Sequence, residues 1–467
     1  MLKTNRKTFI QSLLALFGLS ILDIKKLLPS VYAQTADDLE NFVGSDSVLE
    51  NIKHLFPHTS NQRIRYFNTG TLGPSSNAVI EHLCKEIHLT NGAVVDNKQY
   101  LPNDGSQQWN KHIETLAQFI HCSADELVLT RNTTEGVNII CHGLPKRHDP
   151  YVLITSTKEH IGNIAAWVNR SQNQKDIDIV TFSCNKLSQD ECYTLILERI
   201  SSFPDKAIIL SIPHIASDGY LFPVERIGAK IAELNAQREN KIFYFVDGAQ
   251  SLGMLDVNVK QYQCHAYAAS GHKWLCGPKG TGLLYIHSSA QKFIQPEFVG
   301  AYACDASFEP LRIDFANNAY RYTYGTQSMQ LFSGLAKSAD LFQSLGKKTI
   351  QDKVFSLAQY FRRGLQHYNQ SQSRFYIHDV VNADSTSYSG MVSFAIEDKL
   401  NRTYLDSKDL AYERISKLKL NDQRIYLRLR HIYEDNLDAI RASFHIFHDT
   451  DDVDLLLLSI QKYLASL

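Results

Sequence analysis

Short apolar runs alternate with helical patterns over the middle of the chain. Strands that alternate with helices predict an α/β fold, in which a mostly parallel sheet of seven strands has helices on both faces. Ligands of such sheets bind at the carboxyl ends of the strands, so the residues just past each run are the ones to inspect. The seven runs with strand-like composition are Glu126–Thr130, Tyr151–Thr155, Ile177–Phe182, Ala207–Ile212, Ile242–Val246, His265–Ala269 and Thr281–Ile286.

The pattern changes after about residue 330, where long helical stretches dominate and strands are fewer and more polar. The clearest of these strands lie around Gly390–Ile396 and Arg441–Phe447. We interpret residues 330–467 as a small α+β domain beside a large domain at 66–329, and 34–65 as an N-terminal arm against the small domain. A chain of 467 residues is long for one compact core, which supports this division.

The first thirty-odd residues have the pattern of an export signal. Arg6 and Lys7 precede an apolar run, Phe9–Leu22, and Val31-Tyr32-Ala33 ends in a small residue that suits cleavage. The run is too short for a comfortable transmembrane span. Arg-Lys-x-Phe-Ile resembles the twin-arginine signal, with lysine where the second arginine is usual. We predict that residues 1–33 are a signal peptide and that the mature protein is periplasmic. The alternative is an amphipathic N-terminal helix of a cytoplasmic protein.

Charge and cysteine content exclude some partners and sites. The chain has 48 basic and 49 acidic residues, which leaves no electrostatic footprint for nucleic acid or an anionic membrane. All eight cysteines lie beyond residue 33 and none forms a Cys-x-x-Cys pair, which argues against a zinc ribbon or a thioredoxin-like site. We expect no metal site. We expect most cysteines to be buried as small apolar residues, and spacing leaves any disulfide pairing open.

Two strand ends carry the strongest chemical signal. One apolar strand ends in Asp247-Gly248-Ala249-Gln250, and another is followed by Ser270-Gly271-His272-Lys273. An aspartate and a lysine at two strand ends can reach opposite sides of one planar cofactor. Pyridoxal 5′-phosphate (PLP) needs this arrangement, because a lysine amine forms its Schiff base and a carboxylate keeps its pyridine nitrogen protonated. Singly, Asp247 could be a helix cap and Lys273 a surface lysine; together they predict a PLP site.

The segment from Phe245 to Tyr285 resembles the class V aminotransferase family of fold-type I PLP enzymes. Further motifs that resemble the family are spread from Asn68 to Asp449, which covers most of the mature chain. The resemblance implies a PLP cofactor, with Lys273 as the Schiff-base lysine and Asp247 as the partner of the pyridine nitrogen.

The resemblance also assigns contacts to the cofactor's ring and phosphate. Gln250 would donate to the phenolate oxygen, and Ser270 and His272 would hold the phosphate, as in the family's Ser-x-His-Lys pattern. Asn-Thr-Thr-Glu-Gly follows a strand and opens a helix, where backbone N–H groups and a threonine hydroxyl make an anion site. Read alone, this stretch is equally a helix cap. Within the family it matches the phosphate cup, so we expect Thr133 and Thr134 to bind the cofactor.

Four more positions follow from the resemblance. His160, in Glu-His-Ile-Gly-Asn, matches the family's Glu-His-x-x-Asn motif and would stack on the pyridine face and assist proton transfer. Ser217 follows the fourth strand, where the family contacts the ring. Thr326, in Tyr-Gly-Thr-Gln, resembles the element that reaches the phosphate of the other subunit, which implies a homodimer. Arg441, in an Arg-x-Ser motif, would bind the substrate α-carboxylate as a bidentate pair.

The reaction stays open at this point, since one scaffold hosts many. In every member of the family the substrate amine displaces the Schiff-base lysine, which is Lys273 in this chain. The freed lysine becomes a base beside Cα. Cysteine desulfurases also need a nucleophilic cysteine well after the lysine. Here the only cysteines beyond Lys273 are Cys276 and Cys304, and none occurs in 305–467. Desulfuration through a persulfide on the enzyme is therefore not expected.

Motif details resemble one branch of the family most. The stretch at 67–76 and the residues around Lys273 look like the isopenicillin N epimerase-like branch, which includes exported PLP enzymes. We expect epimerisation or amino transfer at Cα of an amino acid or a peptide-borne amino group. A C–S or C–Se lyase that needs no cysteine is an alternative. So is a catalytically inactive binding protein of this fold, although the joint presence of Lys273, Asp247, His160 and Arg441 argues against it.

Overall fold

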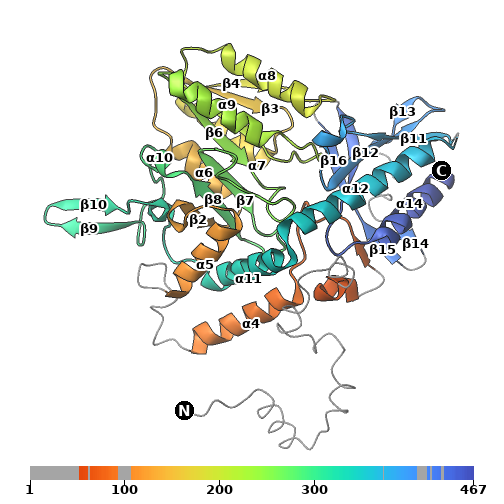
Figure 1. The fold of residues 1–467 in the computed structure, drawn as a ribbon, viewed down its shortest axis with the longest axis horizontal. Coiled ribbons are helices and arrows are strands. Elements are labelled where there is room, and N and C mark those ends of the chain that lie inside the picture. Colours follow the sequence, from red (N-terminus) through yellow and green to blue (C-terminus); the bar gives the residue numbers. More distant parts are fainter. Residues whose placement is uncertain are drawn as a thin grey trace, which may run out of the picture.

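Two large sheets joined by long helices form most of the described part of the chain, which also has a three-stranded and a two-stranded sheet (Figure 1). The structure is a computed structural model, and the predicted signal peptide lies outside the residues that it describes. Those residues are 52–60, 64–92, 107–371, 373–406, 418–420, 423–432 and 436–467.

The larger sheet has seven strands in the order β2-β8-β7-β6-β5-β3-β4. The strands from β4 to β7 in this order pair in parallel, and β8 is antiparallel to both of its neighbours. This arrangement confirms the predicted mostly parallel sheet, and each strand end lies within one residue of the predicted run. The strands are β2 (Leu127–Thr130), β3 (Tyr151–Ser156), β4 (Ile177–Phe182), β5 (Ile208–Pro213), β6 (Ile242–Asp247), β7 (Ala266–Ser270) and β8 (Gly282–Ile286).

Helices cover both faces of this sheet because alternate strand residues point to opposite sides. Val152 and Leu210 belong to one buried cluster, whereas Leu153 and Ile209 belong to the other. The helices α6 (Thr133–Gly143), α7 (Ile161–Gln174) and the short α10 (Ser288–Gln291) pack on the second cluster. On the first cluster pack α5 (Gln107–Phe119), α8 (Gln189–Ser201), α9 (Val224–Gln237) and α11 (Met329–Leu345).

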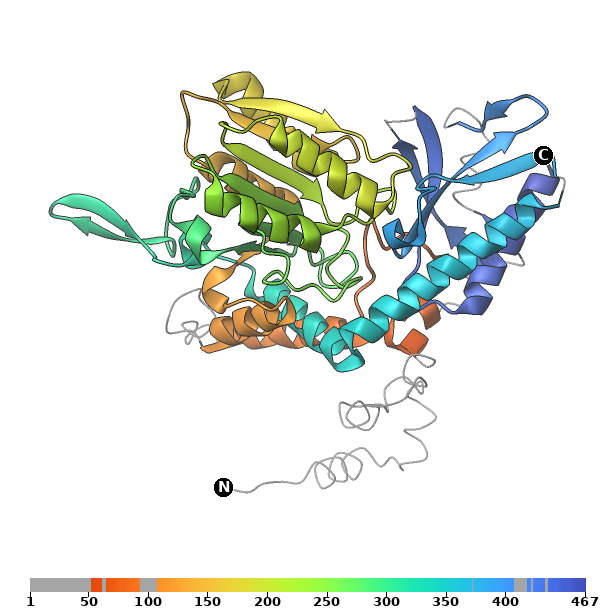
Figure 2. The ribbon, with the colours of Figure 1, turned by 45° about the horizontal axis from the view of Figure 1, so that its top comes forward.

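The smaller sheet is antiparallel, in the order β11-β12-β17-β16, with the short β13 beside β12. One of its faces packs on two helices through a separate buried cluster. Figure 2 shows α12 running from the large sheet to the small one. The elements are β11 (Phe375–Asp379), β12 (Met391–Asp398), β13 (Thr403–Tyr404), β16 (Arg428–Ile432), β17 (Leu437–Ser443), α12 (Lys347–Asn369) and α14 (Thr450–Ala465).

One predicted strand of this sheet is displaced. The strand expected at Arg441–Phe447 is observed as β17, which starts earlier and ends at Ser443. Beyond it the chain leaves the sheet, because His445 Nε2 donates to the Trp274 carbonyl (2.8 Å) and the Phe447 ring packs 5.0 Å from that of Phe56.

The described part of the predicted N-terminal arm contacts both the small domain and the first buried cluster, to which Ile52 and Phe56 belong. Lys53 forms ion pairs with Asp449 and Asp452, at 2.5 and 2.7 Å. The strand β1 (Ile64–Tyr66) pairs in parallel with β15 (Gln423–Tyr426). The remaining elements are η3 (Ile52–Leu55), η4 (Pro57–Ser60), α4 (Asn77–Gly92), η6 (Ala124–Glu126), η7 (Ala319–Tyr322), η8 (Ser385–Ser387) and β14 (Lys419–Leu420).

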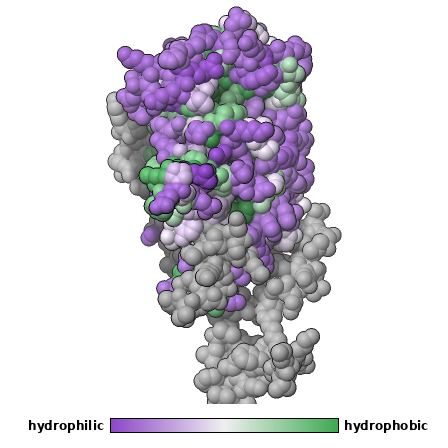
Figure 3. Space-filling model, turned by 90° about the vertical axis from the view of Figure 1, so that its left-hand side faces the viewer, coloured by the Kyte–Doolittle hydropathy of each residue, from purple (hydrophilic) through white to green (hydrophobic). Residues whose placement is uncertain are grey.

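A two-stranded hairpin of β9 (Cys304–Phe308) and β10 (Leu311–Phe315) projects from the large domain (Figures 1 and 2). Its apolar side chains are open to solvent: Phe308 is 81% exposed and Leu311 79%. The face toward which the hairpin points is largely hydrophilic, with scattered hydrophobic patches (Figure 3). Within the described residues, no helix has the length and apolar character to cross a membrane, and no cluster of metal-binding side chains occurs.

Candidate active site

The predicted site residues gather at one edge of the large sheet, where its parallel strands end. Asp247 is the last residue of β6, and Lys273 lies three residues past the end of β7. His160 follows β3, and Ser217 follows β5. The carboxyl ends of parallel strands meet at one edge, which is why segments far apart in the sequence converge here.

Asp247 and Lys273 influence each other electrostatically. Asp247 is 5% exposed and accepts a hydrogen bond from the Ala249 backbone at 2.8 Å. Burial raises the pKa of its carboxyl, while the Ala249 N–H and the charge of Lys273 oppose that rise. Burial lowers the pKa of Lys273 to about 8, against the opposing carboxylate of Asp247. The two charged groups thus share one water-poor site, as a lysine and a carboxylate on one cofactor require.

A pair of buried hydroxyls lies where the sequence predicts the phosphate cup. Thr133 is the first residue of α6, and its Oγ1 lies 2.7 Å from Ser270 Oγ. The helix N-terminus beside them presents backbone N–H groups, which suit an anion. His272 lies nearby in sequence, and its Nδ1 donates to the Thr281 carbonyl at 3.1 Å. Together with Lys273, these groups are a donor set that fits the phosphate and the aldehyde of PLP.

His160 caps the next helix rather than standing free. Its Nδ1 accepts a hydrogen bond from Gly162 N at 3.0 Å, at the start of α7. Burial lowers the pKa of His160 to about 4, and the positive charges of Lys273 and Arg430 act in the same direction. The ring is therefore neutral near pH 7. Thr134 is exposed and adjoins this turn, since a Cβ built on Gly162 would lie 2.9 Å from Thr134 Oγ1.

Gln250 is buried and already makes two hydrogen bonds. Its Nε2 donates to the Gly70 carbonyl at 3.0 Å, and its Oε1 accepts from the Trp274 indole at 2.8 Å. An amide nitrogen carries two hydrogens. The predicted donation to the cofactor's phenolate oxygen would therefore use the second hydrogen, with the side chain fixed by Gly70 and Trp274.

Arg441 reaches the same site from the small domain. It is 1% exposed; its Nη1 donates to the Ser217 carbonyl and its Nη2 to Thr71 Oγ1, both at 3.1 Å. Burial lowers the pKa of Arg441 to about 9, and Arg430 and Arg428 add to the effect. Ser217 thus contributes its backbone oxygen to the position of Arg441.

A cavity of about 230 Å³ lies between the two domains beside these groups; its lining includes His160 and Ser217 but not Lys273 or Arg441. The segment Thr157–Ile161 and Ser217 form its large-domain wall, and β16 forms the other. Two arginines on β16, Arg428 and Arg430, also line the cavity, and no sequence motif pointed to them. The signal that could have found them is the spacing: residues two apart on a strand point to the same face.

Thr326 lies apart from these groups in the single chain. It is exposed, in the loop before α11. The neighbouring Tyr324 hydroxyl donates to Glu135 Oε1 at 3.0 Å, which ties this loop to the first turn of α6.

The cysteines beyond Lys273 are not placed as nucleophiles at the cavity. Cys276 is 1% exposed, its Sγ lies 3.6 Å from His445 Nε2, and burial raises the pKa of its thiol. Cys304 begins the hairpin strand β9. Elsewhere, Cys184 and Cys192 form a disulfide between the loop after β4 and helix α8.

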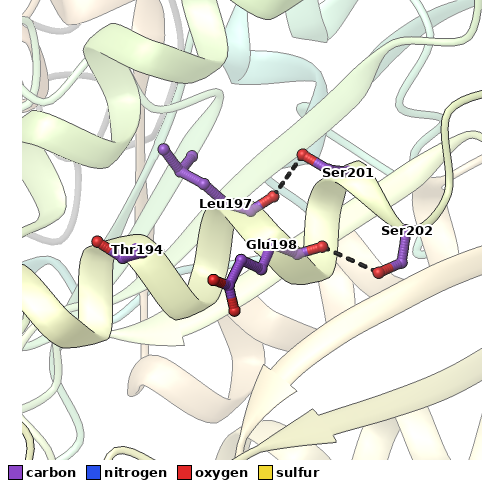
Figure 4. Close-up of a pocket in the computed structure, with 5 residues that line it drawn as sticks. All are labelled: Thr194, Leu197, Glu198, Ser201 and Ser202. Atoms are coloured by element: carbon purple, nitrogen blue, oxygen red, sulfur yellow. Dashed lines mark hydrogen bonds between the residues drawn. The ribbon is translucent and has the colours of Figure 1, made fainter.

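A second hollow, on α8, offers no comparable chemistry (Figure 4). Ser201 and Ser202 donate to the carbonyls of Leu197 and Glu198, one turn earlier in the helix. These bonds satisfy the hydroxyls locally, so no polar groups converge on a ligand.

Comparison with known proteins identifies the family. The model of the aminotransferase class-V family matches residues 66–456. A probable cysteine desulfurase of Pyrococcus abyssi is 24% identical over 430 residues, which cover 90% of this chain and 98% of that protein.

Two solved structures of C-DES share the fold. One, a complex of this cystine C–S lyase with its reaction product cysteine persulfide, gives a TM-score of 0.71 at 22% identity, over 88% of this chain and 99% of that one. The other, a C-DES variant with glycine covalently linked to the PLP cofactor, gives 0.72 at 23% identity, over 88% and 98%. None of these three matches is named an epimerase, so the epimerase-like branch stays a prediction. The chain belongs to the class V aminotransferase family, and it is a PLP-dependent enzyme of fold type I.

Proposed function

We propose that this enzyme moves the Cα proton of a free α-amino acid, and that the outcome is epimerisation or amino transfer. The observation that carries the proposal is the approach of a buried arginine to the region of the lysine. Arg441 reaches across from the small domain to the Ser217 carbonyl and Thr71 Oγ1, and its charge lowers the pKa of Lys273.

Each of the site residues has a separate role in this reaction. When bound, PLP draws electrons from the bonds at the substrate's Cα. Lys273 takes up the Cα proton, and its pKa of about 8 suits a base near neutral pH. Arg441 holds the α-carboxylate, which orients the Cα–H bond. Neutral His160 lines the adjoining cavity without adding a positive charge, and the buried Asp247 at the end of β6 is the carboxyl that would pair with the pyridine nitrogen.

A second candidate is a C–S lyase, which the likeness to C-DES favours. The reaction product of C-DES is cysteine persulfide, which itself carries the sulfur. A lyase of that kind needs no cysteine of the enzyme to hold sulfur. The burial of Cys276 suits this candidate and speaks against sulfur transfer through the enzyme.

Incubation of the purified holoenzyme with a panel of L-amino acids that includes cystine separates these candidates. A keto acid supports amino transfer, a D-amino acid supports epimerisation, and a persulfide or sulfide supports the lyase. If no member of the panel is converted, the proposal of a free amino acid substrate is wrong.

The role of Arg441 has its own test. Arg441→Lys should raise KM about tenfold, equivalent to ~1.4 kcal/mol, because a lysine cannot reproduce the bidentate fork. An unchanged KM would contradict binding of a free α-carboxylate by Arg441. A peptide-borne substrate, which offers no free α-carboxylate there, would give that result.

We also propose that the active unit is a homodimer, with Thr326 completing the partner's phosphate site. Its exposure leaves it available to another chain. The exposed apolar side chains of the hairpin, Phe308 and Leu311, are a further surface that a partner could cover.

Finally, we propose that the mature enzyme acts in the periplasm. The signal-like residues 1–33 support this location. So does the disulfide between Cys184 and Cys192, since disulfides are typical of oxidising compartments.

A further inference from the structure

His445 is a buried histidine that the proposed chemistry does not use. It lies two residues past the end of β17, and both it and Trp274 are fully buried. Its Nε2 donates to the Trp274 carbonyl at 2.8 Å, and its ring stacks on the indole, with ring centroids 5.6 Å apart. Burial lowers the pKa of His445 to about 3, so the ring is neutral and carries its proton on Nε2. His445 thus holds the residue that directly follows Lys273.

The indole of Trp274 in turn fixes the orientation of the Gln250 amide. Gln250 Oε1 accepts from the indole N–H at 2.8 Å, and Nε2 donates to the Gly70 carbonyl at 3.0 Å. An indole N–H can only donate and a carbonyl can only accept. A half-turn of the amide would therefore break both hydrogen bonds, and the second Nε2 hydrogen has one fixed direction.

One segment of the small domain supports both ends of this hydrogen-bond chain. At one end His445 contacts Trp274, as described above. At the other end, Gly70 N donates to Ser443 Oγ at 3.3 Å, and a Cβ built on Gly70 would lie 3.0 Å from Arg441 Nη2. The amide of Gln250 is therefore held between two groups that the same stretch of chain, 441–445, keeps in place.

We propose that His445 and Trp274 are positioning residues for the cofactor, because they direct the free Nε2 hydrogen of Gln250 toward its phenolate oxygen. His445 acts through the position of Trp274, and Trp274 acts through its indole N–H. The inference concerns how PLP is held. It goes beyond the proposed function and applies to each of the reactions considered there.

Trp274→Phe tests the inference, because it removes the indole N–H and keeps an aromatic ring against His445. A donor to the phenolate oxygen stabilises the negative charge there, so weaker donation by Gln250 should raise the pH midpoint of the visible cofactor band. The midpoint should rise by about half a pH unit, and the dissociation constant of PLP should increase about threefold to fivefold. Absorbance titrations of the holoenzyme with pH, and of the apoenzyme with PLP, measure the two. Trp109→Phe, at a buried tryptophan that packs on Phe332 of α11, is the matched control and should change neither.

A double substitution shows whether the effect passes through Gln250. In a Gln250→Met background, Trp274→Phe should cause no further shift of the midpoint, since members of one hydrogen-bond chain do not contribute additively. His445→Leu should shift the midpoint in the same direction as Trp274→Phe. His445→Gln should shift it less, because its amide can still donate to the Trp274 carbonyl.

Two results would overturn the inference: an unchanged midpoint in Trp274→Phe, or an equal shift with and without the Gln250 amide. Equal shifts in His445→Gln and His445→Leu would overturn the role of His445. If His445→Leu does not fold, Trp274→Phe and His445→Gln still decide, since both keep the site filled. The identity of the product from the amino-acid panel is measured separately, so failure of this inference leaves the proposed function standing.

Discussion

Burial and neighbouring charge set the reactivity of Lys273. Removal from water disfavours its ammonium form, Arg441 and Arg430 disfavour it further, and the Asp247 carboxylate opposes both. With a pKa of about 8, roughly a tenth of the side chain is the neutral amine at pH 7. An ordinary lysine would have far less. Only the neutral amine can attack the aldehyde of PLP.

The pH dependence of cofactor uptake follows from this lowered pKa. Because the neutral fraction grows as pH rises toward 8 and then saturates, the rate of PLP uptake by the apoenzyme should rise about tenfold between pH 6 and 7. It should level off above pH 8. Absorbance after rapid mixing measures the rate. A rate still rising tenfold per pH unit at pH 9 would mean that burial does not lower the pKa of Lys273.

Lys273 should be the one attachment point of the cofactor. Borohydride reduction of the holoenzyme, followed by peptide mass spectrometry, should find the adduct on the peptide that contains Lys273. In Lys273→Ala the adduct and turnover should both be lost. Lys279→Ala is the matched control, because Lys279 lies in the same loop but donates to the Gly73 carbonyl at 2.8 Å. Loss of the adduct in the control, or its survival in Lys273→Ala, would refute the assignment.

At the scale of an element, the N-terminus of α6 is the clearest anion site. Thr133 stands in its first turn and is joined to Ser270 at the end of β7, so one hydrogen bond ties a helix start to a strand end. The sequence predicted both residues at the phosphate but not the hydrogen bond between them, because they belong to different elements.

Thr133→Val should weaken PLP binding by about fivefold to tenfold, since it removes a hydroxyl worth ~1 kcal/mol and leaves Ser270 without its partner. Fluorescence titration of the apoenzyme with PLP measures the dissociation constant. Thr194→Val, on the remote surface of α8, is the control and should leave it unchanged (Figure 4). Equal affinity for PLP in Thr133→Val and the wild type would show that Thr133 does not bind the phosphate.

At the scale of the whole molecule, the dimer proposal predicts complementation between two inactive chains. In a mixed dimer of Lys273→Ala and Thr326→Ala, one of the two composite sites has both residues. Random assembly of equal amounts should therefore recover about a quarter of wild-type activity. Activity assays after co-expression measure this recovery. Full activity of the wild type as a monomer at nanomolar concentration would disprove the composite site.

Export is predicted to follow cofactor loading. The phosphate cup depends on the folded sheet, and the twin-arginine route carries folded proteins. Cell fractionation should place the mature protein in the periplasm, with N-terminal sequencing showing a start after Ala33. Replacing Arg6 and Lys7 with glutamine should retain a yellow, active precursor inside the cell. Full-length wild-type protein confined to the cytoplasm would refute export and leave the PLP assignment intact.

The sequence by itself determined the seven strands of the large sheet, since they are short runs of strand-like composition between helical patterns. Six of these strands are buried on both faces, and the edge strand β4 is partly exposed. It also determined the Asp247 and Lys273 pair, because Asp247 ends one strand, Lys273 lies three residues past another, and the two side chains together suit one cofactor. These features depend on short sequence patterns, which can be recognised without the tertiary structure.

Only the tertiary structure decided which distant residues join them. Gln250 is held by Gly70 and Trp274, and Arg428 is brought opposite Arg441 by strand register. The end of β17 at Ser443 was likewise set by contacts of the following residues with the large domain and the N-terminal arm. Register and packing depend on elements far apart in the chain. A shift of one residue in the pairing of β16 with β17 would turn Arg428 from the cavity to the core. The set of charged side chains at the cavity is therefore a property of the fold and not of any single motif.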